Sequence, residues 1–191
     1  MNKIMSKSGF TLLELLVVVA LTATLAGAAI PAVLTAIPAI NLKTAANGFA
    51  GDLKLTRSYA IKRQETTGLF FDISDRSYKI VANGPDGLAG TPDDTMLKKV
   101  MLSNFKGGVH YGSGPARSQA RETGGPFADN FSGITCQYPR LFYTKNGMNG
   151  GGMGYVYLSN RYKQICYAIG INSTAGVVVM KKTSGNIWKK L

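Results

Sequence analysis

The chain has 191 residues, with 22 Lys or Arg against 10 Asp or Glu, so its formal net charge is +12. This length fits one folded domain and scarcely allows two. One His and two Cys are too few for a structural zinc site, and they leave few ways to build a His-dependent catalytic centre. The composition therefore argues against a metalloenzyme, and we expect no enzymatic activity. The positive charge is compatible with anionic partners but identifies none.

The apolar residues are concentrated near the amino terminus. After Glu14, residues 15–42 contain no charged side chain. Because a bilayer core of about 30 Å requires about 20 helical residues, this run is long enough to span a membrane. A cleaved secretory signal is the alternative, since Lys3 and Lys7 precede the run and small residues lie at 26–29. The run is long for such a signal, and Glu14 within it needs a partner or a function.

The motif around this glutamate is the most specific signal in the sequence. Residues 7–16 read Lys-Ser-Gly-Phe-Thr-Leu-Leu-Glu-Leu-Leu. This segment resembles the prepilin cleavage and methylation motif of type IV pilins and type II secretion pseudopilins. The resemblance implies that a prepilin peptidase cleaves between Gly9 and Phe10 and methylates the new amino group of Phe10. It also implies that Glu14 pairs with the terminal amine of a neighbouring subunit during assembly, which agrees with the cost of an unpaired charge in lipid.

The same resemblance implies a division of the chain, a location and a set of partners. The partners are other pilin or pseudopilin subunits, the prepilin peptidase, an inner-membrane assembly platform and membrane lipid. Because the leader is basic, the amino terminus is expected in the cytoplasm. The protein would cross the bacterial inner membrane once, carry its globular domain in the periplasm, and enter a filament after assembly. The expected parts are a cleaved leader (1–9), a transmembrane and filament-core helix (10–40), an amphipathic periplasmic helix (41–66) and a β-rich globular domain (67–191).

Helical spacing continues beyond the apolar run. Pro31 and Pro38 lie within the run, and each removes a backbone donor, so we expect the helix to kink or loosen between Gly27 and Pro38. Beyond the prolines, one stripe recurs at steps of three and four residues and is typical of a helix face buried against a domain. Its members are Leu42, Ala46, Phe49, Leu53, Thr56 and Ala60.

The sequence after Gln64 predicts a sheet. Residues 68–73 and 78–81 are short runs of aromatic and β-branched residues joined by Ser-Asp-Arg-Ser, the pattern of a hairpin with a short loop. The predicted fold class is α+β, with a long N-terminal transmembrane and amphipathic helix packed on a mainly antiparallel, pilin-like β-sheet domain. Further strands are predicted at 96–102, 107–111, 134–143, 155–158, 164–171 and 177–181, with an exposed loop at 112–130.

Later segments narrow the resemblance to a subgroup. Residues 52–64 with the strand at 70–72 look like the helix-to-sheet junction of the minor pseudopilin H and FimT group, and 141–147 and 171–177 are similar to its closing strands. The implied function is that of a minor structural subunit of a type II secretion pseudopilus or a type IV pilus. The alternative is a DNA-binding minor pilin of the FimT type, acting in natural transformation. Against it, residues 176–179 read Gly-Val-Val-Val and lack the Gly-Arg-x-Arg motif of DNA-capturing members.

The carboxy-terminal third keeps a polyanion-binding hypothesis open. Residues 130–191 contain eight basic residues and no acidic one, interleaved with aromatic residues, a mixture suited to phosphate contacts and base stacking. A solvated basic face, with its aromatic residues in the sheet core, is the alternative. The candidate contacts are Arg161, Lys163, Lys181, Lys182, Lys189 and Lys190.

An acidic loop could hold a metal ion. Asp86, Asp93 and Asp94 lie among glycines and prolines and could present oxygen ligands to Ca²⁺, although their spacing is not that of an EF-hand. A solvated loop of tight turns is the alternative, and no other cofactor is predicted.

Three further side chains could carry chemistry. Cys136 and Cys166 each lie in a predicted strand, and the sequence leaves open whether they form a disulfide or remain free thiols. His110 has no Ser or Cys nucleophile near it in the sequence, so a structural or surface histidine is expected.

Overall fold

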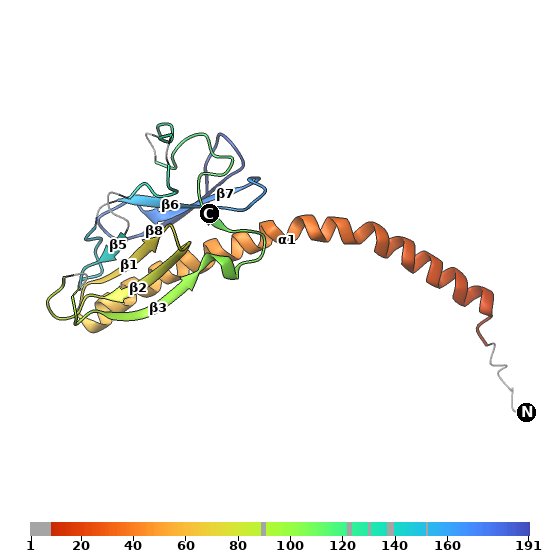
Figure 1. Cartoon of the computed structure of the whole chain (residues 1–191), viewed down its shortest axis with the longest axis horizontal. Coiled ribbons are helices and arrows are strands. Elements are labelled where there is room, and N and C mark those ends of the chain that lie inside the picture. The colour runs from red at the N-terminus through yellow and green to blue at the C-terminus, as the bar shows by residue number, and fades with distance from the viewer. Residues whose placement is uncertain (1–8, 89–90, 122–123, 130, 137–139, 152) are drawn as a thin grey trace, which may run out of the picture. The chain divides into compact units, whose positions relative to one another are not determined.

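The computed structural model describes residues 9–88, 91–121, 124–129, 131–136, 140–151 and 153–191. Within these residues lie one long helix, one short 3-10 helix (Leu102–Asn104) and nine strands (Figure 1). The helix is α1 (Leu12–Arg63). The strands are β1 (Thr67–Asp72), β2 (Ser77–Ala82), β3 (Thr95–Met101), β4 (His110–Tyr111), β5 (Arg140–Tyr143), β6 (Gly154–Ser159), β7 (Cys166–Ile171), β8 (Val178–Thr183) and β9 (Lys189–Lys190).

The first part of α1 is apolar and exposed. The segment Leu12–Pro31 is long and apolar enough to cross a membrane, and none of it is buried. Its two threonines satisfy their hydroxyl groups within the helix, because Thr22 donates to the Val18 carbonyl at 2.9 Å and Thr24 to the Ala20 carbonyl at 3.1 Å. Hydrocarbon tolerates hydroxyl groups that are paired with the helix backbone in this way.

The helix is continuous through both prolines. Helical structure runs without interruption from Leu12 to Arg63, so the predicted boundary between residues 40 and 41 is not a boundary in secondary structure. By packing, the chain divides into two units, Met1–Ala36 and Ile37–Leu191. The kink assigned to Pro31 and Pro38 stays a prediction.

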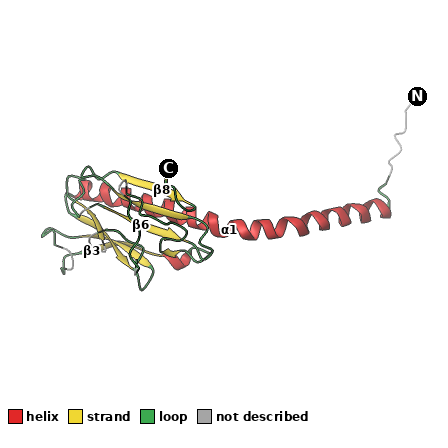
Figure 2. Ribbon diagram, turned by 90° about the horizontal axis from the view of Figure 1, so that it is seen from above, coloured by secondary structure: helices red, strands yellow, loops and turns green. Residues whose placement is uncertain are grey.

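The second part of α1 packs into the core of the larger unit, alongside the strands (Figure 2). The predicted stripe is confirmed, because all six of its side chains have no exposed surface. Thr56, its polar member, donates its hydroxyl to the Asp52 carbonyl at 2.7 Å. After Arg63 the helix ends at Gln64, whose φ of 58° turns the chain towards β1.

Sheet A contains four antiparallel strands in the order β3-β2-β1-β5. The predicted hairpin is confirmed as β1 and β2. Leu69, Ile80 and Leu141 on the inner face are fully buried. On α1, Phe49 meets Tyr78 of β2 edge to face, with ring centroids 5.0 Å apart. The inner face of sheet A therefore shares a core with the helix.

A polar cluster ties α1 to sheet A. The Asp52 side chain is buried, and its carboxylate accepts a hydrogen bond from the Tyr78 hydroxyl at 2.8 Å. The ammonium of Lys98 lies 2.6 and 2.8 Å from the two carboxylate oxygens. Both oxygens are thus paired, so this buried charge is compensated.

Sheet B contains five antiparallel strands in the order β4-β6-β7-β8-β9. One face joins the core of α1 and sheet A, through Val156, Leu158 and Ile169. The opposite face forms a second core against the segment from Ala116 to Phe131. Tyr157 lies at its centre, in contact with the rings of Phe127, Phe131 and Trp188.

This second core corrects the predicted exposed loop at 112–130. The segment is irregular, but Ala116 and Ala120 are buried, and the backbone N–H of Ala120 donates to the Tyr157 hydroxyl at 2.9 Å. The physical reason is that strand alternation places Tyr155 and Tyr157 on the side of sheet B away from the helix. Without further packing these rings would be exposed to solvent, and residues of the segment pack against them.

Two strand predictions also differ from the structure, and one strand was not predicted. Residues 134–143 were predicted as one strand, but only Arg140–Tyr143 forms β5, while Ile134 makes an isolated bridge to Val156. Residues 137–139 of that prediction lie outside the described residues. The strand predicted at 107–111 is reduced to β4, and β9 was not predicted because two lysines carry no apolar alternation.

Candidate functional site

The motif at the amino terminus is built around the first turn of α1. Gly9 and Phe10 precede the helix, and the Phe10 side chain is 78% exposed. The hydroxyl of Thr11 accepts a hydrogen bond from the backbone N–H of Glu14 at 3.2 Å, so Thr11 caps the helix. Thr-x-x-Glu is the capping-box pattern. It was present in the sequence, but the role of Thr11 was not predicted.

Glu14 is a charged group without a partner inside the described part of the chain. Its side chain is exposed, and the two salt bridges among the described residues involve other carboxylates. The positive end of the helix dipole favours a carboxylate in the first turn. In lipid, however, full compensation would require a cation from another molecule.

Cys136 and Cys166 are both free thiols, so the disulfide left open by the sequence is not formed. Cys136 lies against Gly154 at the start of β6, whereas Cys166 is paired with Ser159 at its end. The length of β6 separates them by about 17 Å, far beyond the roughly 7 Å that a disulfide tolerates between Cα atoms. Burial raises the pKa of the Cys136 thiol to about 12 and also raises the pKa of Cys166. Neither is a reactive thiolate.

His110 has a serine partner that the sequence did not reveal. Its Nε2 lies 3.1 Å from the Ser159 hydroxyl, and its Nδ1 lies 2.9 Å from the Gly108 carbonyl. The two residues are brought together because β4 and β6 pair, with His110 opposite Ser159. Since Ser159 has no exposed surface, a substrate cannot reach this hydroxyl, and the contact joins the two strands.

The acidic loop uses its carboxylates for local turns. Asp86 accepts from the Leu88 N–H at 2.8 Å, and Asp93 accepts from the Thr91 hydroxyl at 2.6 Å. That hydroxyl is also the main reason why the pKa of Asp93 is lowered. Among the described residues, no three His, Cys, Asp or Glu side chains gather where they could hold a metal ion. Calcium binding by Asp86, Asp93 and Asp94 stays a prediction.

The six basic candidates of the carboxy-terminal third do not share one surface. In the pairing of β8 with β9, Lys181 lies opposite Lys190 and Lys182 opposite Lys189, so the two pairs point to opposite faces. Lys181 is engaged inside the fold, donating to the Ala120 carbonyl at 2.7 Å with its ammonium 5.7 Å from the centroid of the Tyr155 ring. Arg161 and Lys163 lie in the turn between β6 and β7.

The aromatic residues of this third are mostly in the core. Tyr155, Tyr157 and Tyr167 are buried, whereas Tyr162 is exposed. This arrangement matches the alternative in which the rings belong to the sheet core. Polyanion binding by the carboxy-terminal set stays a prediction.

Comparisons with known proteins bear mainly on the amino terminus. Residues 4–30 match the model of the prokaryotic N-terminal methylation motif. A comparison with curated proteins gave no match. Among solved structures, the chain is similar to the minor pseudopilin EpsH from the type 2 secretion system of Vibrio cholerae, with 13% identity and a TM-score of 0.48 over 73% of this chain and 95% of that chain. A second structure of EpsH has 18% identity and a TM-score of 0.41, over 73% and 92%.

The matched residues include Gly9, Phe10 and Glu14, whereas cleavage after Gly9 and membership of the pseudopilin H and FimT subgroup stay predictions. The chain therefore carries the N-terminal methylation motif of prokaryotic pilins.

Proposed function

We propose that this protein is a minor pilin or pseudopilin, a structural subunit of a type II secretion pseudopilus or a type IV pilus. In this proposal a prepilin peptidase cleaves after Gly9 and methylates Phe10. The apolar part of α1 then anchors the subunit in the inner membrane and later packs into the core of the filament. The β-rich domain lies outside that core.

The observation that carries the proposal is an exposed carboxylate at the start of a charge-free, exposed helix. Glu14 lies one turn from the new terminus at Phe10, and no charged side chain follows it until Lys43. Cleavage would create one cation, the amine of Phe10. Because each charge alone is costly in lipid, pairing of this amine with Glu14 of a neighbouring subunit favours association.

The exposed apolar surface supports the same role. From Leu12 to Pro31 the helix buries no side chain in its own fold. A surface of this kind is stable in hydrocarbon or against similar helices. The same apolar surface of Leu12–Pro31 would contact lipid before assembly and neighbouring helices after it.

The test is the variant Glu14→Gln, which removes the charge and keeps the shape of the side chain. We expect it to be inserted in the membrane and processed normally, but to be missing from sheared filaments. Mass spectrometry of the wild-type subunit should find the loss of residues 1–9 and one added methyl group on Phe10.

The matched control is Glu65→Gln, which removes a carboxylate just beyond the end of α1 and should enter filaments as the wild type does. If Glu14→Gln enters filaments as efficiently as Glu65→Gln, the pairing role of Glu14 is wrong. If the wild-type chain keeps residues 1–9 in cells that contain the peptidase, the proposal as a whole is wrong.

A further inference from the structure

The outer face of sheet A, turned away from α1, carries one row of cationic and aromatic side chains. In the register of the sheet, Lys99 of β3 lies opposite Lys79 of β2, Lys79 opposite Phe70 of β1, and Phe70 opposite Arg140 of β5. Directly opposite residues point to the same face. Three cations and one ring therefore lie in a line across all four strands, although Phe70 and Arg140 are 70 residues apart in the sequence.

A second, apolar row lies beside the first. It contains Met96, Val81, Gly68 and Phe142, which are opposite one another in register. Gly68 leaves room for the rings, because a Cβ at this position would lie 2.9 Å from the Phe70 ring and 3.4 Å from Cβ of Phe142. The two aromatic side chains are thus placed side by side on the sheet surface.

The Phe142 ring is held in place by its surroundings. A Cβ at Gly150 or Gly151 would lie 2.5 or 2.3 Å from ring atoms of Phe142, so these glycines accept the ring against their backbone. The guanidinium of Arg140 lies 5.5 Å from the centroid of Phe142 and 6.0 Å from that of Phe70. Both rings remain half-buried, so each keeps part of its surface open to a ligand.

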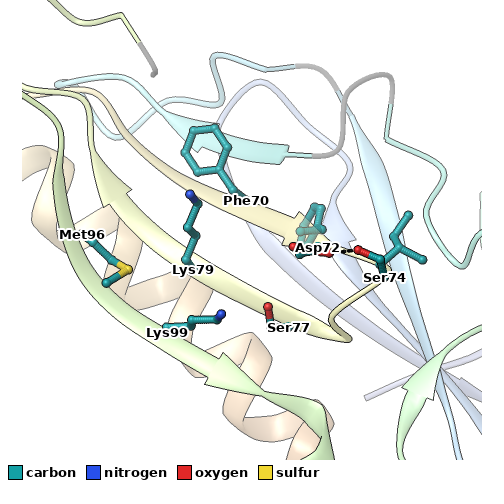
Figure 3. Close-up of a pocket in the computed structure, with 9 residues that line it drawn as sticks. Phe70, Asp72, Ser74, Ser77, Lys79, Met96 and Lys99 are labelled. Carbon is teal, nitrogen blue, oxygen red and sulfur yellow. Dashed lines mark hydrogen bonds between the residues drawn. The ribbon is translucent and has the colours of Figure 1, made fainter. Parts of the chain in front are cut away.

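The face is open and hollowed. A groove of about 780 Å³ runs over β1, β2 and β3, lined by Phe70, Lys79, Met96 and Lys99 among others. Figure 3 shows these side chains on the side of sheet A opposite to α1. Lys79 and Lys99 are exposed. Lys79 has no hydrogen-bond or ion-pair partner within the described part of the chain, whereas Lys99 contacts Asp75 at 2.9 Å.

We propose that this outer face of sheet A binds single-stranded nucleic acid. Lys79 and Lys99 would contact successive phosphates, and bases would stack on the open parts of Phe70 and Phe142. Cations along a groove, combined with exposed rings, are the general means of binding a single strand without sequence preference, and antiparallel sheets use surface aromatic residues in this way. The net charge of +12 favours association with a polyanion.

The chemistry favours a nucleic acid over an acidic peptide. A peptide carboxylate would neutralise the lysines but would leave the two rings without a planar partner. Asp72 and Asp75 limit the cationic strip at the hairpin end of the sheet. The Asp75 carboxylate accepts a hydrogen bond from the Lys99 ammonium. A phosphate that contacts Lys99 would have to displace this carboxylate.

The experiment measures the fluorescence anisotropy of a labelled oligothymidylate of about 12 nucleotides with the full chain in neutral detergent. We expect binding that weakens with added salt. Phe70→Leu should weaken it roughly 5- to 100-fold, the loss of one base–ring stack. Lys79→Gln should lower the slope of log affinity against log salt by about 0.7, the effect of one phosphate contact. Asp75→Asn should tighten binding, because it releases Lys99.

The matched control is Lys54→Gln, which removes an exposed lysine of α1, on the opposite side of sheet A, and should leave binding unchanged. Circular dichroism checks that every variant is folded. The proposal is overturned if the wild type does not bind at low salt, or if Phe70→Leu binds as the wild type does. It is also overturned if polyglutamate competes as well as the oligonucleotide, which would indicate an acidic protein partner. The same holds if Lys189→Gln, in the carboxy-terminal set, weakens binding while Phe70→Leu and Lys79→Gln do not. All these outcomes are independent of filament assembly.

Discussion

The two sheets differ most in what lies on the face turned away from the helix. On sheet B that face carries Tyr155 and Tyr157, which are buried in a second core with Ala116, Ala120, Phe127, Phe131 and Trp188. On sheet A the corresponding face carries Phe70 and Phe142, which stay half-buried beside exposed lysines. The same kind of residue is thus part of a core on one sheet and part of a surface on the other. Aromatic content alone therefore does not show whether the face of a sheet is part of a core or is available for binding. The presence of a segment packed on that face does show it.

The largest effect is expected in the covered face of sheet B. Tyr157→Ala should destabilise the fold by about 3–5 kcal/mol, because it removes a fully buried ring that packs against the rings of Phe127, Phe131 and Trp188. Chemical denaturation of the full chain in neutral detergent measures this. Tyr162→Ala, which truncates an exposed ring, is the control and should change the free energy of unfolding by no more than about 0.5 kcal/mol. Equal effects of the two variants would contradict the second core.

A smaller effect is expected where α1 meets sheet A. Asp52→Ala should cost about 1–3 kcal/mol, because it leaves the buried Tyr78 hydroxyl without its partner. The Lys98 ammonium is partly exposed and can be rehydrated. Asp75→Ala breaks an exposed pair with Lys99 and should cost at most about 1 kcal/mol. Thermal unfolding of both variants compares their losses of stability. A larger loss for Asp75→Ala than for Asp52→Ala would contradict the buried cluster.

The smallest effect concerns alkaline pH. Burial is the main reason why the pKa of Tyr157 is raised to about 12 and the pKa of Tyr78 is also raised. A raised pKa means that the unfolded chain loses these protons first, so stability is complete below about pH 10 and falls as the pH rises further. For Tyr157 the loss should reach about 1 kcal/mol by about pH 11.

The free energy of unfolding, measured from about pH 10 upwards, gives the slope of stability against pH. Tyr157→Phe should flatten the slope, because it removes one titrating hydroxyl from the covered face. A slope identical to that of the wild type would mean that the Tyr157 hydroxyl is not protected in the fold.

The sequence predicted what depends on neighbouring residues. The apolar span, the buried stripe from Leu42 to Ala60 and the β1–β2 hairpin follow from local spacing, and each is present. The cap on α1 was not predicted, although its pattern is equally local, since Thr11 and Glu14 are three residues apart.

What the sequence did not predict depends on pairing between distant strands. Arg140 reaches Phe70 because β5 pairs with β1, and no local pattern specifies that register. His110 meets Ser159 for the same reason, through β4 and β6. The packing of residues 116–131 on sheet B was not predicted because Gly, Ser, Pro and Ala show no period, although Ala116 and Ala120 are small enough to pack against the rings of the sheet.

The unbroken course of α1 has a mechanical consequence. No loop interrupts the helix between Ile37 and Leu42, so tension applied along α1 enters the folded domain through helical backbone, in which Pro38 lacks one hydrogen bond. Leu42, Phe49 and Leu53 lie inside the core and would resist that tension together, in shear. The load is shared among many contacts at once, and a pulled domain is therefore expected to yield in a single step rather than strand by strand.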